Sequence, residues 1–159
     1  MPPDVVTTLI VHFDGLCDRF TVGGPRNPGG CGCGGWIITQ LPPDVHADVR
    51  TGHACYGHGL GVTNNTSEYQ AALDALHCVA ATSWRGHVIL RGDSQLVVNQ
   101  VTGAWRCNTD ALRALRDSLR QAMALFERVD IEWVPRETNE PADALSREAY
   151  HAATGLSPR

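Results

Sequence analysis

Runs of apolar residues and stripes at helical spacing follow one another along the whole chain. The first run, residues 9–13, is almost continuously apolar and ends in Asp14 and Gly15, which is typical of a central strand buried on both faces. Residues 36–39 and part of residues 49–60 predict two further strands. Because loops alone join these three strands, we expect an antiparallel meander.

The second half of the chain alternates helices with strands. Apolar spacing and capping residues predict, in order, helix 66–81, strand 87–91, helix 94–101, a helix capped by Asn108 or Thr109, strand 130–134 and a helix opened by Glu140 and Pro141. Asn65 or Thr66 is the expected N-cap of the first helix. A right-handed crossover leaves strand 87–91 parallel to strand 9–13, so we expect an α/β fold with a mixed sheet.

Three segments outside these elements predict irregular structure. Residues 16–35 are rich in glycine and lack the GxxxxGK[ST] pattern, so they predict a turn-rich loop rather than a phosphate-binding one. Residues 135–139 predict a loop before the last helix. The tail from Thr154 is expected to fray.

Composition is that of an ordinary globular protein, with 43% hydrophobic and 19% charged residues among 159. This length suits a single domain over residues 1–159. No apolar run is long enough to cross a bilayer, and residues 1–4 do not begin a secretory signal. We therefore expect a cytoplasmic (intracellular) monomer with no membrane association and no obligatory protein partner.

Charge and cysteine content narrow the choice of partners. The formal net charge of −4 means that any contact with nucleic acid must be local. Without a secretory signal, the six cysteines predict free thiols rather than disulfides. Cys31 and Cys33 are close in sequence, but no CxxC or HxxxH spacing is present, so we expect no structural zinc.

Carboxylates mark the ends of the predicted parallel strands. Asp14 and Asp93 should emerge at one edge of the sheet, and Glu68 and Asp143 fall in the first turns of helices that could flank it. Four converging carboxylates repel one another unless divalent cations lie between them, and oxygen ligands suit Mg²⁺ or Mn²⁺. Taken singly, Asp14 could cap a turn, and Glu68 and Asp143 could favour helix dipoles, so periodicity alone leaves both interpretations open.

Five segments resemble ribonuclease H of type 1, in the order of that family and over nearly the whole chain. They are DGLC (14–17), NPGG (27–30), TNNTSE (63–68), DSQ (93–95) and WVPRETNEPAD (133–143). The resemblance implies the ribonuclease H-like fold, a five-stranded mixed sheet flanked by helices. It also implies an endonuclease that hydrolyses the RNA strand of RNA/DNA hybrids with water as nucleophile, leaving 5′-phosphate and 3′-hydroxyl ends.

The resemblance also implies a metal site. It assigns metal binding and catalysis to Asp14, Glu68, Asp93 and Asp143. Two Mg²⁺ ions per site are implied, with Mn²⁺ as a substitute, and such a pair promotes in-line phosphoryl displacement.

Substrate contacts are implied in the same way. The family's substrate-binding positions fall on Gly15, Cys17, Asn27, Thr63, Asn64, Asn65, Gln95 and Asn139. Asn27, Asn64 and Gln95 match contacts in the minor groove, where 2′-hydroxyls identify the RNA strand. Thr63 and Asn65 match a region that holds the DNA backbone. Taken alone, the asparagines would fit turn chemistry before a helix.

The chain departs from the family pattern in three places. Many members carry a histidine in the loop before the last helix, where this chain has Arg136, which cannot act as a general base at ordinary pH but can contact phosphate or assist metal and product exchange. The basic insertion of several members is missing between Trp105 and Thr109, which predicts weak, salt-sensitive binding through a few arginines such as Arg26, Arg106 and Arg136. The loop after residue 17 is longer than usual, which affects the placement of Asn27.

Three other functions compete with this interpretation. Another nuclease of the superfamily is disfavoured by the intact Thr-Asn-Asn-x-x-Glu run. A catalytically silent module that binds hybrids would be expected to lack an acid, and all four are present. An unrelated α/β scaffold would not carry all five motifs in order.

Overall fold

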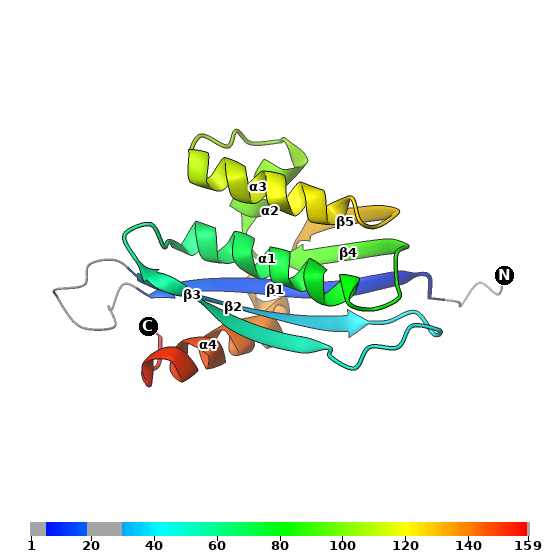
Figure 1. The fold of residues 1–159 in the computed structure, drawn as a ribbon, viewed down its shortest axis with the longest axis horizontal. Coiled ribbons are helices and arrows are strands. Elements are labelled where there is room, and N and C mark those ends of the chain that lie inside the picture. Colours follow the sequence, from blue (N-terminus) through cyan, green and yellow to red (C-terminus); the bar gives the residue numbers. More distant parts are fainter. Residues whose placement is uncertain (1–5, 19–29, 159) are drawn as a thin grey trace.

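The fold is a five-stranded mixed sheet with helices on both faces, as the sequence predicts (Figure 1). The structure is a computed structural model that describes residues 6–18 and 30–158. Its elements are β1 (Thr8–Asp18), β2 (Gly30–Gln40), β3 (Thr51–Gly59), α1 (Asn64–Ala80), β4 (His87–Gly92), α2 (Gln95–Thr102), α3 (Asp110–Met123), β5 (Arg128–Trp133), a 3₁₀ turn (Arg136–Thr138) and α4 (Glu140–Thr154).

The sheet combines the predicted meander with parallel strands. Its order is β3-β2-β1-β4-β5, and β2 is antiparallel to both β1 and β3. Strand β4 pairs in parallel with both β1 and β5. Helices α1, α2 and α3 lie on one side of the sheet and α4 lies on the other (Figure 1). The central strand β1 therefore has helices over both faces.

Strand β1 is held by the main core. Its residues Leu9, Val11 and Phe13 are fully buried and share one hydrophobic cluster with Tyr69 and Leu76 of α1. Side chains two apart on a strand point to the same face, so these three all meet the helices of that face. Burying each such side chain stabilises the fold by about 1.5–3 kcal/mol. The core thus fixes α1 relative to β1.

The prediction of a loop over residues 16–35 is wrong at both ends. Strand β1 continues to Asp18, and β2 already begins at Gly30. Helices pack very closely here: a Cβ on Gly34 would lie 2.8 Å from the Cβ of Ala71 in α1, and one on Gly35 would lie 2.6 Å from the amide nitrogen of Ser146 in α4. Glycine in these positions permits close packing, although in a sequence it indicates a turn.

The helix boundaries agree with the predictions except at α1 and at the C-terminal end. Thr63, rather than Asn65 or Thr66, is the N-cap of α1: its Oγ1 accepts a hydrogen bond from the Thr66 amide at 3.1 Å. Of the two predicted caps of α3, Asn108 and Thr109, the structure shows Thr109. Helix α4 continues through Thr154 and ends at Gly155, whose φ of 72° closes the helix. Among the described residues, no helix combines the length and the apolar character needed to span a membrane.

Candidate active site

Strand β1 extends beyond the carboxyl end of its parallel neighbour β4. The last paired residues of these strands are His12 and Arg91, yet β1 continues to Asp18. Asp14 lies just beyond the last pair and is only 5% exposed. Asp93 directly follows Gly92, the last residue of β4. Parallel pairing therefore brings both aspartates to one edge of the sheet.

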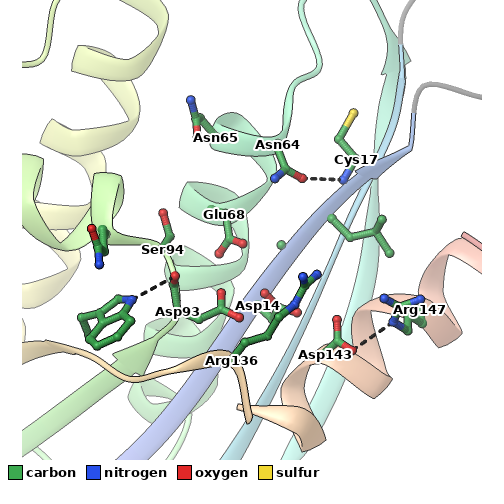
Figure 2. Close-up of a pocket in the computed structure, with 14 residues that line it drawn as sticks. Asp14, Cys17, Asn64, Asn65, Glu68, Asp93, Ser94, Arg136, Asp143 and Arg147 are labelled. Carbon is green, nitrogen blue, oxygen red and sulfur yellow. Dashed lines mark hydrogen bonds and ion pairs between the residues drawn. The ribbon is translucent and has the colours of Figure 1, made fainter. Parts of the chain in front are cut away.

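Helix α1 adds Glu68 to the same place. Strand β1 and α1 approach so closely at Gly15 that a Cβ there would collide with the backbone of Glu68. This contact holds Glu68 over β1 with 6% of its surface exposed. Oxygens from Asp14, Glu68 and Asp93, one from each, all lie within 4.8 Å of one another. Figure 2 shows these three side chains converging from β1, α1 and the end of β4.

Asp143 completes the set from the opposite side of the pocket. It lies in the first turn of α4 and lines the same pocket, of about 580 Å³. Its Oδ2 is 3.0 Å from Nε of Arg147, one turn further along α4 (Figure 2). We call Asp14, Glu68, Asp93 and Asp143 the acidic cluster.

Burial and mutual repulsion perturb the acidic cluster. Burial, then the charges of Asp93 and Asp143, raise the pKa of Asp14 to about 8. Burial and the neighbouring Asp14 raise the pKa of Glu68 well above its usual range. Burial also raises the pKa of Asp93. A hydrogen bond with Asp14 and the positive charge of Arg136 partly oppose this rise. The cluster thus favours either bound protons or a cation.

The residues of the acidic cluster fit a divalent metal. Oε2 of Glu68 is buried and, within the described residues, has no hydrogen-bond partner. A buried carboxylate oxygen without a hydrogen-bond partner, next to two other carboxylates, is well suited to bind a cation. The cation would give this oxygen a partner and would reduce the repulsion between the three negative charges. The donor set is entirely oxygen, which suits Mg²⁺ or Mn²⁺.

Polar residues predicted to contact substrate surround the acidic cluster. Asn64, Asn65 and Gln95 line the pocket together with Gly15 and Cys17. Oδ1 of Asn64 accepts a hydrogen bond from the backbone amide of Cys17 at 3.0 Å, which ties the start of α1 to β1 (Figure 2). The side-chain amide nitrogen of Asn64 is left to act as a donor toward a ligand.

The other predicted contacts lie outside this pocket lining. Thr63 is exposed and caps α1. Asn139 is fully buried: its Nδ2 donates to the carbonyl of Phe13 at 2.8 Å, and its Oδ1 lies 3.1 Å from Nδ1 of His12. This side chain anchors the start of α4 to β1 beneath the pocket. Asn27 lies outside the described residues.

Several lining residues were not singled out from the sequence. They are Leu16, Ser94, Trp133 and Arg147. Ser94 caps α2, and the indole of Trp133 donates to the backbone carbonyl of Asp93 at 3.2 Å, so both fix the Asp93 turn. Arg147 could have been recognised, since it follows Asp143 by four positions in a predicted helix. Arg136, which was singled out, is exposed at the rim of the pocket.

Comparison with known proteins identifies relatives of this chain. A family model described as reverse transcriptase-like matches residues 31–149. Ribonuclease HI of Halobacterium salinarum is 35% identical over 153 residues, which cover 96% of this chain and 73% of that protein. The bifunctional protein Rv2228c of Mycobacterium tuberculosis is 34% identical over 133 residues, which cover 82% of this chain but only 34% of that protein.

Solved structures agree with these relatives. The crystal structure of RNase H1 from Halobacterium salinarum superposes with a TM-score of 0.75 at 35% identity, covering 91% of this chain and 98% of that one. LC11-RNase H1, solved in complex with an RNA/DNA hybrid, shares the fold with a TM-score of 0.71 at 24% identity, covering 91% of this chain and 98% of that one. With a matching family model over most of its length and a close relative along nearly all of it, this chain belongs to the ribonuclease H type 1 family.

Proposed function

We propose that this protein is an endonuclease that hydrolyses the RNA strand of RNA/DNA hybrids and leaves 5′-phosphate and 3′-hydroxyl ends. The observation that carries the proposal is the acidic cluster, in which acids from β1, α1, the turn after β4 and α4 line one open pocket. The name of the Halobacterium relative and the hybrid bound by LC11-RNase H1 support the same substrate class. Membership of the family makes hydrolysis of a phosphodiester the expected reaction.

The acids would bind metal, whereas the surrounding polar residues would contact the substrate. Asp14, Glu68 and Asp93 would hold the metal, with Asp143 as the fourth ligand. Two Mg²⁺ ions held there, or Mn²⁺ in their place, would supply activation of the attacking water and stabilisation of the leaving 3′-oxygen. Arg136, at the rim, is placed to contact a phosphate of the substrate but not to accept a proton.

Residues at the starts of α1 and α2 distinguish the RNA strand of the hybrid from the DNA strand. Asn64 and Gln95 line the pocket on two different elements, α1 and α2. Their side-chain amides can donate to or accept from 2′-hydroxyls across a minor groove. Asn65 and Thr63, at the same end of α1, are left to hold the DNA strand.

A second depression supplies positive charge for the nucleic-acid backbone. It lies between α2 and α3, has a volume of about 560 Å³ and is lined by Arg106, Arg113, Arg116 and Arg120 beside Trp105. Arg120 donates to the carbonyls of Gln100 and Val101, so its guanidinium is held in place. Because such contacts are few and the molecule is acidic, binding should be weak and should weaken further as salt rises.

Cleavage of a labelled hybrid tests the proposal directly. The purified chain is incubated with an RNA/DNA hybrid, with single-stranded RNA and with duplex RNA, in Mg²⁺, in Mn²⁺ and in chelator. We expect cutting only of the RNA strand of the hybrid, only with metal, and products with 5′-phosphate ends. Asp14→Asn should abolish it, whereas Asp44→Asn, at an exposed loop position, should not.

Two other outcomes would overturn the proposal. Folded protein that binds the hybrid but cuts nothing with either ion would identify a binding module without catalysis. Cutting of single-stranded RNA or of both strands would identify a different nuclease specificity.

A further inference from the structure

Three cysteines meet on the face of the sheet that α4 covers. Cys31 and Cys33 are two apart on β2, so both side chains point to one face, and Cys33 pairs directly with Cys55 on β3. The Sγ of Cys31 lies 4.0 Å from that of Cys33 and 3.7 Å from that of Cys55. All three sulfurs lie within 4.8 Å of one another, and the thiols are free. We call these residues the thiol cluster.

An irregularity in the strand pairing brings the third sulfur into reach. Cys31 pairs with His58 and Cys33 with Cys55, so β3 contains one more residue than β2 over this stretch. The extra residue forms a bulge that includes Gly57, whose φ of 92° suits glycine. Bulges change the direction of side chains, and this one places Cys55 against both cysteines of β2.

The spacing of the sulfurs matches ligation of one metal ion. Thiolates bind zinc at about 2.3 Å, so two ligands of one ion lie about 3.8 Å apart in tetrahedral geometry and about 4.0 Å apart in trigonal geometry. Two of the observed separations, 3.7 Å and 4.0 Å, fall at these values, and the third, between Cys33 and Cys55, is within 4.8 Å. Zinc and Cu(I) are the common cations that prefer such soft ligands.

Among the described residues, the thiol cluster is open to solvent at Cys55. Cys31 and Cys33 are buried, at 2% and 0% exposure, beneath Ala149 and Tyr150 of α4. Cys55 is exposed on β3, the edge strand of the sheet. A cation can therefore reach the thiol cluster from solvent beside Cys55 while the other two ligands stay shielded.

We propose that Cys31, Cys33 and Cys55 together bind one thiophilic cation, Zn²⁺ or Cu⁺, which joins the edge strand β3 to β2. The three thiols each lose a proton on binding, and their thiolate sulfurs become the ligands. A fourth position, on the exposed side, is left to water for Zn²⁺, whereas Cu⁺ is satisfied by three sulfurs. This site is separate from the acidic cluster, whose oxygen ligands suit Mg²⁺.

Absorption spectroscopy on the reduced protein tests the site. The full chain is titrated anaerobically with Co²⁺ as a coloured substitute for Zn²⁺, and separately with Cu⁺. Only thiolate ligands give sulfur-to-metal charge-transfer absorption, so binding to the acidic cluster does not interfere with the readout. We expect a band that saturates at one equivalent per chain and, for Co²⁺, is displaced by Zn²⁺.

Matched cysteine variants decide the outcome. Cys55→Ser changes an exposed position, so the variant should fold, and it should lower cation affinity at least tenfold. Cys78→Ser removes a thiol of α1 outside the thiol cluster and should leave the titration unchanged. The bound cation should also slow amide hydrogen exchange along β3 in wild type but not in Cys55→Ser.

Three results would overturn the proposal. They are no charge-transfer band with either ion, equal affinities for wild type and Cys55→Ser, and a Cys31–Cys55 disulfide that persists under the reducing conditions of the titration. Preference between Zn²⁺ and Cu⁺ follows from competition of each ion against a chelator of known affinity.

Discussion

The acidic cluster consists of two pairs with different surroundings. Asp14 and Glu68, the inner pair, are 5% and 6% exposed, and among the described residues neither forms an ion pair with an arginine. Asp93 and Asp143, the outer pair, are half-buried, and each has a nearby arginine: the charge of Arg136 partly opposes the rise in the pKa of Asp93, and Arg147 forms an ion pair with Asp143. Within the described residues, the outer pair is thus the one whose charge is compensated by arginines.

This difference indicates where a metal ion matters most. The inner carboxylates are desolvated and close together, so one of them keeps its proton until a cation arrives. The outer carboxylates are partly neutralised by side chains that can also contact phosphate. We infer that the inner pair determines whether metal binds, and that the outer pair adjusts how easily metal and product exchange.

The largest expected effect comes from neutralising an acid of the inner pair. Glu68→Gln should lower the rate of hybrid cleavage roughly 10³-fold, as removal of a single preorganised electrostatic group does elsewhere. Asp143→Asn should lower it less, by roughly 10- to 100-fold, because Asp143 already shares its charge with Arg147. Single-turnover cleavage in saturating Mg²⁺ measures both.

Unfolding of the same variants provides the control. Glu68→Gln should unfold at the same or a higher urea concentration than wild type without metal, because a repelled buried charge is removed. Equal rate losses for Glu68→Gln and Asp143→Asn, with both proteins folded, would contradict the division into two pairs.

The second-largest expected effect comes from Asn139, whose side chain connects the elements that carry the two pairs. Asn139 links the start of α4, which carries Asp143, to the backbone of β1, which carries Asp14. Asn139→Ala leaves the Phe13 carbonyl and the His12 ring without partners and opens a cavity, so it should lower the free energy of unfolding by about 2–4 kcal/mol. Urea unfolding measures this, with the exposed Asn108→Ala as a control expected to change it by less than about 0.5 kcal/mol. A neutral Asn139→Ala would show that α4 is positioned by other contacts.

Sequence reasoning located the acids better than the details of their surroundings. The apolar run before Asp14 and the right-handed crossover were enough to place Asp14 and Asp93 at one sheet edge, because both follow from general rules of strand burial and handedness. The burial of Asn139 depends on how α4 packs against β1, which no local pattern records. Likewise, the glycines of residues 30–35 serve helix packing, and their pattern resembles that of a turn.

The N-cap of α1 and the thiol cluster were not predicted from the sequence, for different reasons. Residues 63–66 all have side chains that can cap a helix, so composition cannot choose Thr63 among them. Cys55 lies on a different strand from Cys31 and Cys33, and only the strand register brings the three sulfurs together. Ligand spacing along a sequence detects sites within one loop or helix but not across paired strands.

The pH dependence of stability should show that the inner pair retains a proton in the folded state. The pKa of Asp14 is raised from 3.8 to about 8, so between these values the folded protein keeps a proton that the unfolded chain has lost. Its stabilising contribution is complete below about pH 4 and is lost as pH rises through about 8, with a slope of up to roughly 1.4 kcal/mol per pH unit per proton. Urea unfolding in chelator from pH 5 to about 8.5 should show this slope.

The difference between wild type and Asp14→Asn isolates this effect. His12, whose pKa is lowered by burial, contributes the opposite slope at lower pH but is present in both proteins. Saturating Mg²⁺ should flatten the wild-type curve, because the cation replaces the proton. Identical pH profiles for wild type and Asp14→Asn in chelator would show that the inner pair holds no extra proton.

The smallest expected effect concerns the arginine of the outer pair. Arg147 occupies an oxygen of Asp143 that a metal ion would also use, so Arg147→Ala should lower the Mg²⁺ concentration for half-maximal cleavage about two- to fivefold. The effect is small because a partly exposed ion pair is worth only about 0.2–1 kcal/mol. Arg128→Ala, which removes an exposed arginine paired with Asp130 on β5, is the matched control and should not change the Mg²⁺ requirement. If Arg147→Ala instead raises the Mg²⁺ requirement, Arg147 orients Asp143 for the metal rather than competing with it, and the outer pair then resembles the inner pair in depending on the cation.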